Sequence, residues 1–209
     1  WDVSKVTSMA NMFAWCDKLT TIGNVSNWDI GKVTTMESMF VGCTNISSLN
    51  VSNWNTGNVT NMAFMFNHCR NLTTINGIEN FNTTNVTNLF GTFKYCHKLT
   101  ELDLSNWNTS KVTSMGSMFR GCQKLTELDV SGFDTSNVTD MTNMFYNCVS
   151  LTSLDVSNFD ISNVTDMGGM FNTCNKLTSL DVSGFNTGNV TNMASMFYKC
   201  SNLTSLDVS

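Results

Sequence analysis

The sequence contains no proline, only two histidines and few charged residues, which make up 13% of its 209 positions. No apolar run is long enough to cross a bilayer, so no transmembrane segment is expected in this fragment. The net charge of −5 argues against nucleic acid, because contacts to phosphates need lysine and arginine. No change in composition marks a domain boundary. With 41% hydrophobic residues, the chain can still bury a sizeable core.

The arrangements of side chains that typically carry catalysis are also missing. His68 and His97 stand beside Cys69 and Cys96, so a Cys–His nucleophile can be imagined. We expect these cysteines to face the core and the histidines to face solvent, which separates the two groups. Serine, threonine and aspartate recur as columns rather than in one convergent site, and no glycine-rich phosphate loop is found. The sequence therefore predicts no enzyme, no catalytic residues and no cofactor.

A nearly regular internal repeat is the main feature of the chain. The successive cysteines are 27, 26, 27, 26, 26, 26 and 26 residues apart, and they are Cys16, Cys43, Cys69, Cys96, Cys122, Cys148, Cys174 and Cys200. The unit reads L-T-x-L-D-V-S-x-(F/W)-(D/N)-x-x-(N/K)-V-T-x-M-x-x-M-F-x-x-C-x-x. A unit of this size cannot bury its apolar residues alone, so neighbouring units are expected to stack into a solenoid.

Two periodicities within the unit predict its local structure. In the S-L-D-V-S segment apolar and polar residues alternate, which is typical of a half-buried strand. In V-T-x-M-x-x-M-F-x-x-C the apolar residues follow the i, i+3, i+4, i+7 spacing of one helical face, as in Met141, Met144, Phe145 and Cys148. Thr139 stands where a helix N-cap would stand. Each unit is therefore predicted to form a strand, a turn and a short helix.

Stacking would turn sequence columns into ladders of like residues. Two aromatic ladders are predicted in the core, one of Trp1, Trp28, Trp54, Phe81, Trp107, Phe133, Phe159 and Phe185, the other of Phe13, Phe40, Phe66, Phe93, Phe119, Phe145, Phe171 and Phe197. Two units are one residue longer than the rest and carry glycines, Gly23 and Gly77, in the strand. An extra residue beside a strand glycine predicts a β-bulge.

The cysteine column leaves two interpretations open. Adjacent units would place the cysteines about 4.8 Å apart, a separation that permits disulfides. Pairing would, however, divide equivalent sites into alternating couples, and buried cysteine also packs well as a small hydrophobic residue. We expect free, buried thiols. No C-x-x-C spacing is present and a ladder is not tetrahedral, so no metal site is expected.

A column of threonines also has two readings. It consists of Thr7, Thr34, Thr60, Thr87, Thr113, Thr139, Thr165 and Thr191. An exposed threonine ladder resembles the surface of ice-binding solenoids, but those typically present paired threonines on one flat strand. The unit supplies only one threonine here, beside valine, so helix capping is the favoured interpretation.

The C-x-x-L-x-x-L-x-V stretch resembles the leucine-rich-repeat signature. With the preceding M-F-x-x-C and F-(D/N)-T-S-N-V-T segments, the chain looks like BspA-type repeats of the Mycoplasma-lipoprotein style, of about 26 residues. The resemblance covers the whole chain. It implies a curved right-handed solenoid in a surface-exposed or secreted protein, often an adhesin, and it brings no catalytic residues.

The predicted fold is α/β: a leucine-rich-repeat solenoid with a parallel sheet on the concave face and short helices on the convex face. We expect residues 1–209 to be a single solenoid cut from a longer array. Its predicted units are a partial unit 1–18, full units 19–45, 46–71, 72–98, 99–124, 125–150, 151–176 and 177–202, and a partial unit 203–209.

The predicted function is recognition or adhesion at the cell surface or outside the cell, with a protein or glycan bound on the concave sheet. The outward strand positions expected to contact it are Glu101, Asp103, Glu127, Asp129, Ser153, Asp155, Ser157, Ser179, Asp181 and Asp207. The alternative is a structural spacer, stalk or filament repeat, with end-to-end self-association. It is supported by the near-identity of the strand columns, which carry none of the Trp, Tyr or Arg anchors that favour binding.

The aspartates in this set form a column of like charges. Hydrogen bonds from neighbouring serines, raised pKa values or a cation could each relieve their repulsion. An open row of carboxylates offers fewer oxygens than the six to eight that calcium needs in a tight site. We therefore expect weak cation association and no structural metal.

Overall fold

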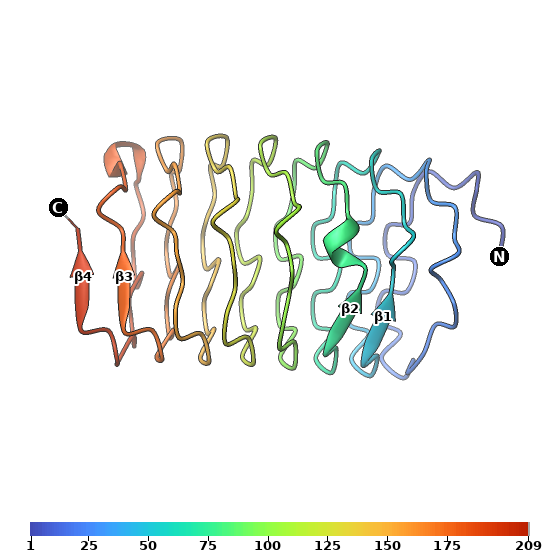
Figure 1. The fold of residues 1–209 in the computed structure, drawn as a ribbon, viewed down its shortest axis with the longest axis horizontal. Coiled ribbons are helices and arrows are strands. Elements are labelled where there is room, and N and C mark those ends of the chain that lie inside the picture. The colour runs from blue at the N-terminus through green and yellow to red at the C-terminus, as the bar shows by residue number, and fades with distance from the viewer. Residues whose placement is uncertain (209) are drawn as a thin grey trace.

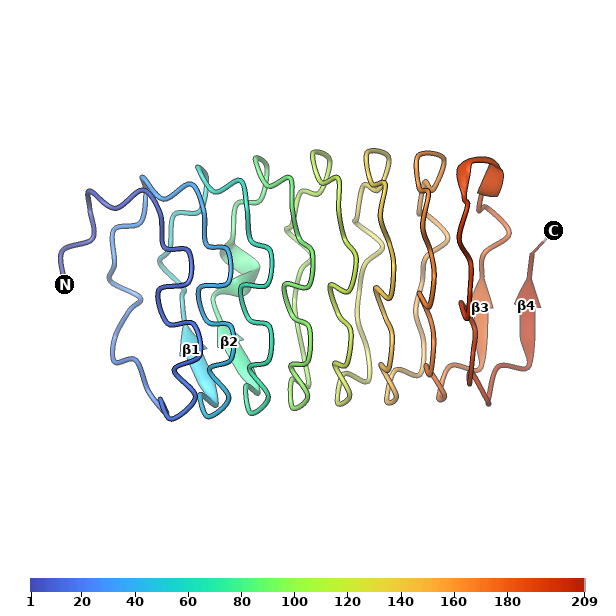
Figure 2. The same cartoon turned by 180° about the vertical axis from the view of Figure 1, so that it is seen from behind.

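The computed structural model describes residues 1–208 as a stack of similar rungs, which lie side by side along the long axis with the two termini at opposite ends (Figures 1 and 2). Its regular elements are short. They are β1 (Ser48–Asn50), β2 (Thr74–Asn76), the 3-10 helix η1 (Ile78–Asn80), β3 (Ser179–Asp181), the 3-10 helix η2 (Thr187–Asn189) and β4 (Ser205–Asp207). Most of each rung is extended backbone and tight turns.

Neighbouring rungs pair in parallel and in register, as the repeat predicts. β1 pairs with β2 so that Leu49 lies beside Ile75, and β3 pairs with β4 so that Leu180 lies beside Leu206. The predicted parallel sheet is nevertheless reduced to these two strand pairs within residues 1–208. Side chains at the ends of the strands limit their length. After β3, for example, the backbone N–H of Ser183 donates to Asp181 Oδ1 and not to another rung.

The predicted short helices are not formed: residues 1–208 contain no α-helix. In the M-x-x-M-F-x-x-C segment, every second backbone N–H donates to a carbonyl of the next rung, as Asn143 N does to Gly168 O and Phe145 N to Met170 O, both at 2.9 Å. The intervening N–H groups close four-residue turns, such as the one in which Met144 N donates to Met141 O at 3.2 Å. The segment is therefore a ladder of turns joined between rungs.

Left-handed residues explain why the helix cannot form. Asn143 has a φ of 57° and Asn147 a φ of 62°, and the equivalent positions of the other rungs repeat this conformation. An α-helix cannot continue through such residues. Tight turns every three to four residues still produce the i, i+3, i+4, i+7 spacing, and Met144 and Phe145 are fully buried as predicted.

The assignment of Thr139 as a helix N-cap is therefore wrong as well. Its Oγ1 donates to the carbonyl of Thr113 at 3.2 Å, and its backbone N–H donates to the same carbonyl at 2.9 Å. Equivalent bonds join Thr165 to Thr139 and Thr191 to Thr165. The threonine column therefore joins each rung to the preceding one by hydrogen bonds.

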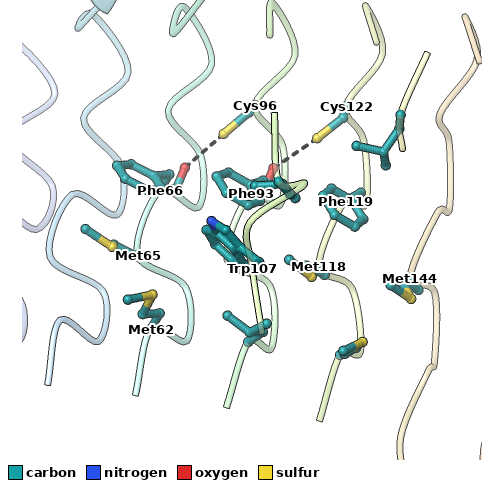
Figure 3. Packing of buried hydrophobic residues seen from close by; sticks show 14 of the residues in the cluster. Met62, Met65, Phe66, Phe93, Cys96, Trp107, Met118, Phe119, Cys122 and Met144 are labelled. Atoms are coloured by element: carbon teal, nitrogen blue, oxygen red, sulfur yellow. Dashed lines mark hydrogen bonds between the residues drawn. The ribbon is translucent and has the colours of Figure 1, made fainter. Parts of the chain in front are cut away.

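The core is a set of ladders running along the solenoid (Figure 3). Phe145 stacks on Phe119 and on Phe171 with ring centroids 5.7 Å apart in both pairs, which confirms the second aromatic ladder. In the first ladder, stacking is continuous from Trp1 to Trp107.

The two longer units accommodate their extra residue differently from a strand bulge. Gly77 follows β2 with a φ of 93° and leads directly into η1, so the additional residue forms a 3-10 turn. A Cβ at Gly77 would collide with the backbone of Ser52 in the preceding rung. Gly23 is also left-handed, with a φ of 74°, but no 3-10 helix follows it.

Candidate functional site

The strand face, by which we mean the exposed side chains of the S-L-D-V-S segments, holds all the residues predicted to bind a ligand. Each of them is exposed, and they are Glu101, Asp103, Glu127, Asp129, Ser153, Asp155, Ser157, Ser179, Asp181 and Asp207. Leu128, Leu154 and Leu180 alternate with them and are buried. The outward direction of these side chains is confirmed, and their role in binding remains a prediction.

Shallow hollows on the strand face bring several of these residues together. One of about 450 Å³ is lined by Glu127, Asp129, Ser153, Asp155, Ser179 and Asp181 around the edges of three leucines. A second, of about 330 Å³, lies beside β2 and η1 and includes Glu79, Glu101 and Asp103. A third, of about 500 Å³, includes Asp181 and Asp207. The strand face is therefore a series of open acidic hollows.

The aspartates of the strand face are held by their own serines. Asp155 Oδ1 accepts hydrogen bonds from Ser157 Oγ at 2.7 Å and from Ser157 N at 3.0 Å, and Asp129 bonds to Ser131 in the same way. These bonds hold the pKa of both aspartates below the usual value. Of the three ways to relieve the charge column, the structure uses the serine hydrogen bonds, and the carboxylates stay charged.

The turn face, formed by the M-x-x-M-F-x-x-C segments, lies on the opposite side of the rungs from the strand face (Figure 2). It carries a group of residues that sequence reasoning missed. On this face, large or charged side chains break the repeat at the two positions that follow the phenylalanine of the second aromatic ladder. Five of them form a continuous line across the rungs, the aromatic–arginine strip: Trp15, His68, Tyr95, Arg120 and Tyr146. The signal in the sequence was the loss of repetition in these columns.

Ring contacts connect the members of the strip. The Trp15 ring lies 6.1 Å from His68, and His68 lies 4.6 Å from Tyr95. The Arg120 guanidinium is 5.6 Å from the Tyr95 ring centroid and 4.4 Å from that of Tyr146. Cation–π attraction of this kind contributes roughly 0.5–2 kcal/mol per contact. The strip is thus a packed surface and not a set of unrelated side chains.

Glycines provide room for the rings of the strip. Gly42 stands one rung after Trp15 in the same column of the repeat, and Gly121 stands one rung after Tyr95 in the same way. Both glycines have left-handed backbone conformations. A Cβ on Gly42 would meet the Trp15 ring, and one on Gly121 would lie 2.6 Å from Tyr95 Cδ1. Each ring therefore lies over a glycine of the next rung.

The cysteines lie apart from the histidines, as expected. Cys69 Sγ donates to Phe40 O at 3.1 Å inside the core, and His68 Nδ1 lies 2.7 Å from Asn67 Oδ1 on the turn face. All eight cysteines are free, and burial raises the pKa of Cys43 to about 11 and that of Cys122 to about 12. The thiols of Cys43 and Cys122 are therefore neutral, and not nucleophilic thiolates, at neutral pH.

Within the part of the chain that the structure describes, no three His, Cys, Asp or Glu side chains gather as metal ligands would. Nor do the described residues include a helix with the length and apolar character needed to span a bilayer.

Comparisons with known proteins agree with the repeat architecture. The family model described as "Mycoplasma protein of unknown function, DUF285" matches residues 1–76, 46–131, 69–154 and 126–209, which together cover the chain. No curated protein matches it in sequence.

Among solved structures, a leucine-rich repeat protein from Bacteroides ovatus is similar, with 22% identity and a TM-score of 0.53 over 81% of this chain and 39% of that one. A leucine-rich cell surface protein from Faecalibacterium prausnitzii matches with 15% identity and a TM-score of 0.32 over 95% and 68% of the two chains. The chain thus spans about two fifths of the Bacteroides protein, and that likeness shows a leucine-rich-repeat-like fold.

Proposed function

Because the chain belongs to the DUF285 family of Mycoplasma proteins, in which no catalytic activity is indicated, we propose that it is a recognition module at the cell surface or outside the cell. It would bind a protein or glycan. The observation that carries the proposal is the contrast between the uniform core and the turn face, where Trp15, Tyr95, Arg120 and Tyr146 interrupt the repeat. Trp, Tyr and Arg are the residue types that dominate binding energies, and a spacer has no use for such irregularity.

The strand face is the second contact surface in this proposal. Its carboxylates are charged, exposed and spaced by the rungs, so they favour a ligand with positive charge. Residues Glu101 to Asp207 of the predicted set would contact such a ligand through many shallow interactions.

Binding of the whole chain to arrays of glycans and extracellular proteins tests the function. We expect saturable binding to a restricted set of ligands. Replacing Asp129, Asp155 and Asp181 by Asn reports the contribution of the strand face, and surface labelling of intact cells reports the location. Absence of binding to every ligand would contradict the recognition function.

A structural spacer that stacks end to end is the second candidate. The near-identity of the strand columns favours it, because they carry no Trp, Tyr or Arg side chains of the kind that anchor a ligand. Sedimentation velocity would distinguish the recognition module from the spacer, because only the spacer requires assemblies whose length grows with protein concentration.

A further inference from the structure

Positive charge is concentrated at the middle of the turn face. The windows 67–71, 94–98 and 120–124 surround three successive cysteines and contain both arginines and both histidines of the chain. Their lysines and arginines are Arg70, Lys94, Lys98, Arg120 and Lys124. None of the three windows contains an Asp or Glu, although the chain as a whole has 16 acidic against 11 basic residues. This local charge is therefore opposite in sign to that of the molecule.

No acidic side chain neutralises these cations. Within residues 1–208, none of the lysines and arginines of the three windows forms an ion pair with a carboxylate. Burial and then the neighbouring Arg120 lower the pKa of Lys94. Burial, followed by Arg70, Lys94 and His97, lowers the pKa of His68. The basic groups repel one another, and an anion placed among them would remove that repulsion.

The Arg120 side chain is held in position by ring contacts and not by hydrogen bonds. Its guanidinium lies between the rings of Tyr95 and Tyr146, which restricts its orientation. Its Nε is buried and has no hydrogen-bond acceptor in the structure. Buried polar groups of proteins are nearly always bonded. Nε is out of reach of an external ligand, so an anion would pair with the terminal nitrogens of the guanidinium, which form no hydrogen bond with any other described residue. Guanidinium groups pair best with carboxylate, phosphate and related oxyanions.

The shape of the strip favours a carbohydrate chain over a peptide. The strip crosses six rungs, or roughly 24 Å at about 4.8 Å per rung, which suits an extended polymer. Its aromatic rings offer apolar faces on which the C–H face of a sugar ring can pack, and Trp15 is 64% exposed. An extended peptide gains much of its affinity from main-chain hydrogen bonds. On the strip those groups already join the rungs, as His68 N does with Lys94 O and Tyr95 N with Arg120 O.

From the cation cluster, the unpaired arginine and the row of rings, we infer that the aromatic–arginine strip binds an acidic polysaccharide, one that carries sulfate or carboxylate groups. This rests on the proposed recognition function and assigns it to the turn face. Arg120 and Lys94 contact the acidic groups, while Tyr95, Tyr146 and Trp15 pack against the sugar rings. The ligand lies along the solenoid axis.

The test compares binding of the full chain to heparin as a sulfated probe, polygalacturonate as a carboxylated probe and dextran as a neutral one. The variant R120Q/K94Q removes the cation of the strip and the neighbouring Lys94. Both residues follow the ladder phenylalanine of their unit, a column in which Asn67 already provides a neutral amide. The control K111Q/K176Q removes two exposed cations outside the strip. We expect at least one acidic probe to bind, dextran not to bind, and R120Q/K94Q to weaken binding at least tenfold at fixed salt, with less than a twofold change in the control.

The two histidines give an independent readout, because both lie on the turn face. In NMR titrations of the wild-type chain, an acidic polysaccharide on the strip should shift the imidazole signals and raise the pKa of His68, since it screens the surrounding cations. Equal weakening in both double variants, unchanged imidazole signals, or equal binding of polyglutamate would overturn the inference. If other ligands still bind through the strand face, the recognition function survives this failure; if nothing binds, both fail.

Discussion

Each cysteine from Cys69 to Cys174 places its sulfur 3.1–3.2 Å from the carbonyl oxygen of a phenylalanine in the preceding rung. The thiol can donate this hydrogen bond only while it is protonated, and a disulfide would remove the donor. The structure thus favours the interpretation that the cysteine column is a packing and hydrogen-bonding ladder.

Thiol titration should separate the buried from the accessible cysteines. In the native chain we expect at most two reactive groups, Cys16, which is exposed, and Cys200, which is partly buried. After denaturation close to eight should react. A mass showing the loss of eight hydrogens would instead indicate four disulfides and contradict the prediction.

Alkaline pH should destabilise the fold. A thiol with a raised folded-state pKa contributes stability that is fully present below the unfolded pKa, near 8.5, and is lost as pH rises toward the folded value. For Cys43 and Cys122 that window extends to about 11 and about 12. Denaturant unfolding between pH 8 and 10.5 should show falling stability. In C122A the fall should be shallower by about 1.4 kcal/mol per pH unit, and an unchanged slope would refute the assignment.

At the scale of the element, the sequence predicted which side chains face inward better than it predicted the backbone. The burial of Met144 and Phe145 followed from their spacing, because the spacing reports which side chains point toward the core. The spacing does not report whether a backbone N–H bonds within its own segment or to the next rung. For this reason the helix was wrongly predicted. The left-handed Asn143 was the one available hint, since asparagine tolerates this conformation.

Side-chain truncation should destabilise the protein much more in the buried turn segments than on the exposed strand face. Phe145→Ala removes a fully buried ring from the middle of a ladder and should cost about 3–5 kcal/mol. Ser153→Ala changes an exposed strand residue and should cost no more than about 0.5 kcal/mol. Chemical denaturation of both variants provides the measurement, and similar losses would mean that the two faces have been assigned wrongly.

On the scale of the whole molecule, the strand face is acidic and the middle of the turn face is basic. The acidic column was predictable, because its aspartates recur at one position of the repeat. For the aromatic–arginine strip, the loss of repetition marked the columns concerned but not the contacts, because its members are 25 or more residues apart and differ in type. Only the stacking of rungs brings Trp15, His68 and Tyr95 together.

The acidic face should attract cations without forming a tight site. Asp103, Asp129 and Asp155 each use one oxygen to bind a serine, and the row remains open. Calorimetry with calcium at moderate salt should show weak, salt-sensitive association. Saturable binding tighter than about 10 µM, abolished by Asp155→Asn, would reveal a metal site and contradict this expectation.

The rings that lie over glycines restrict how a gene for such an array can grow. Trp15 lies over Gly42, Phe64 over Gly91 and Tyr95 over Gly121, in each case one unit further along the chain, and a Cβ on any of these glycines would meet the ring. Duplicating a single unit with its ring would place a side chain under that ring, and deleting the glycine unit would do the same. At these three places a duplication or deletion therefore keeps the ring packing only if the unit with the ring and the glycine unit after it stay together.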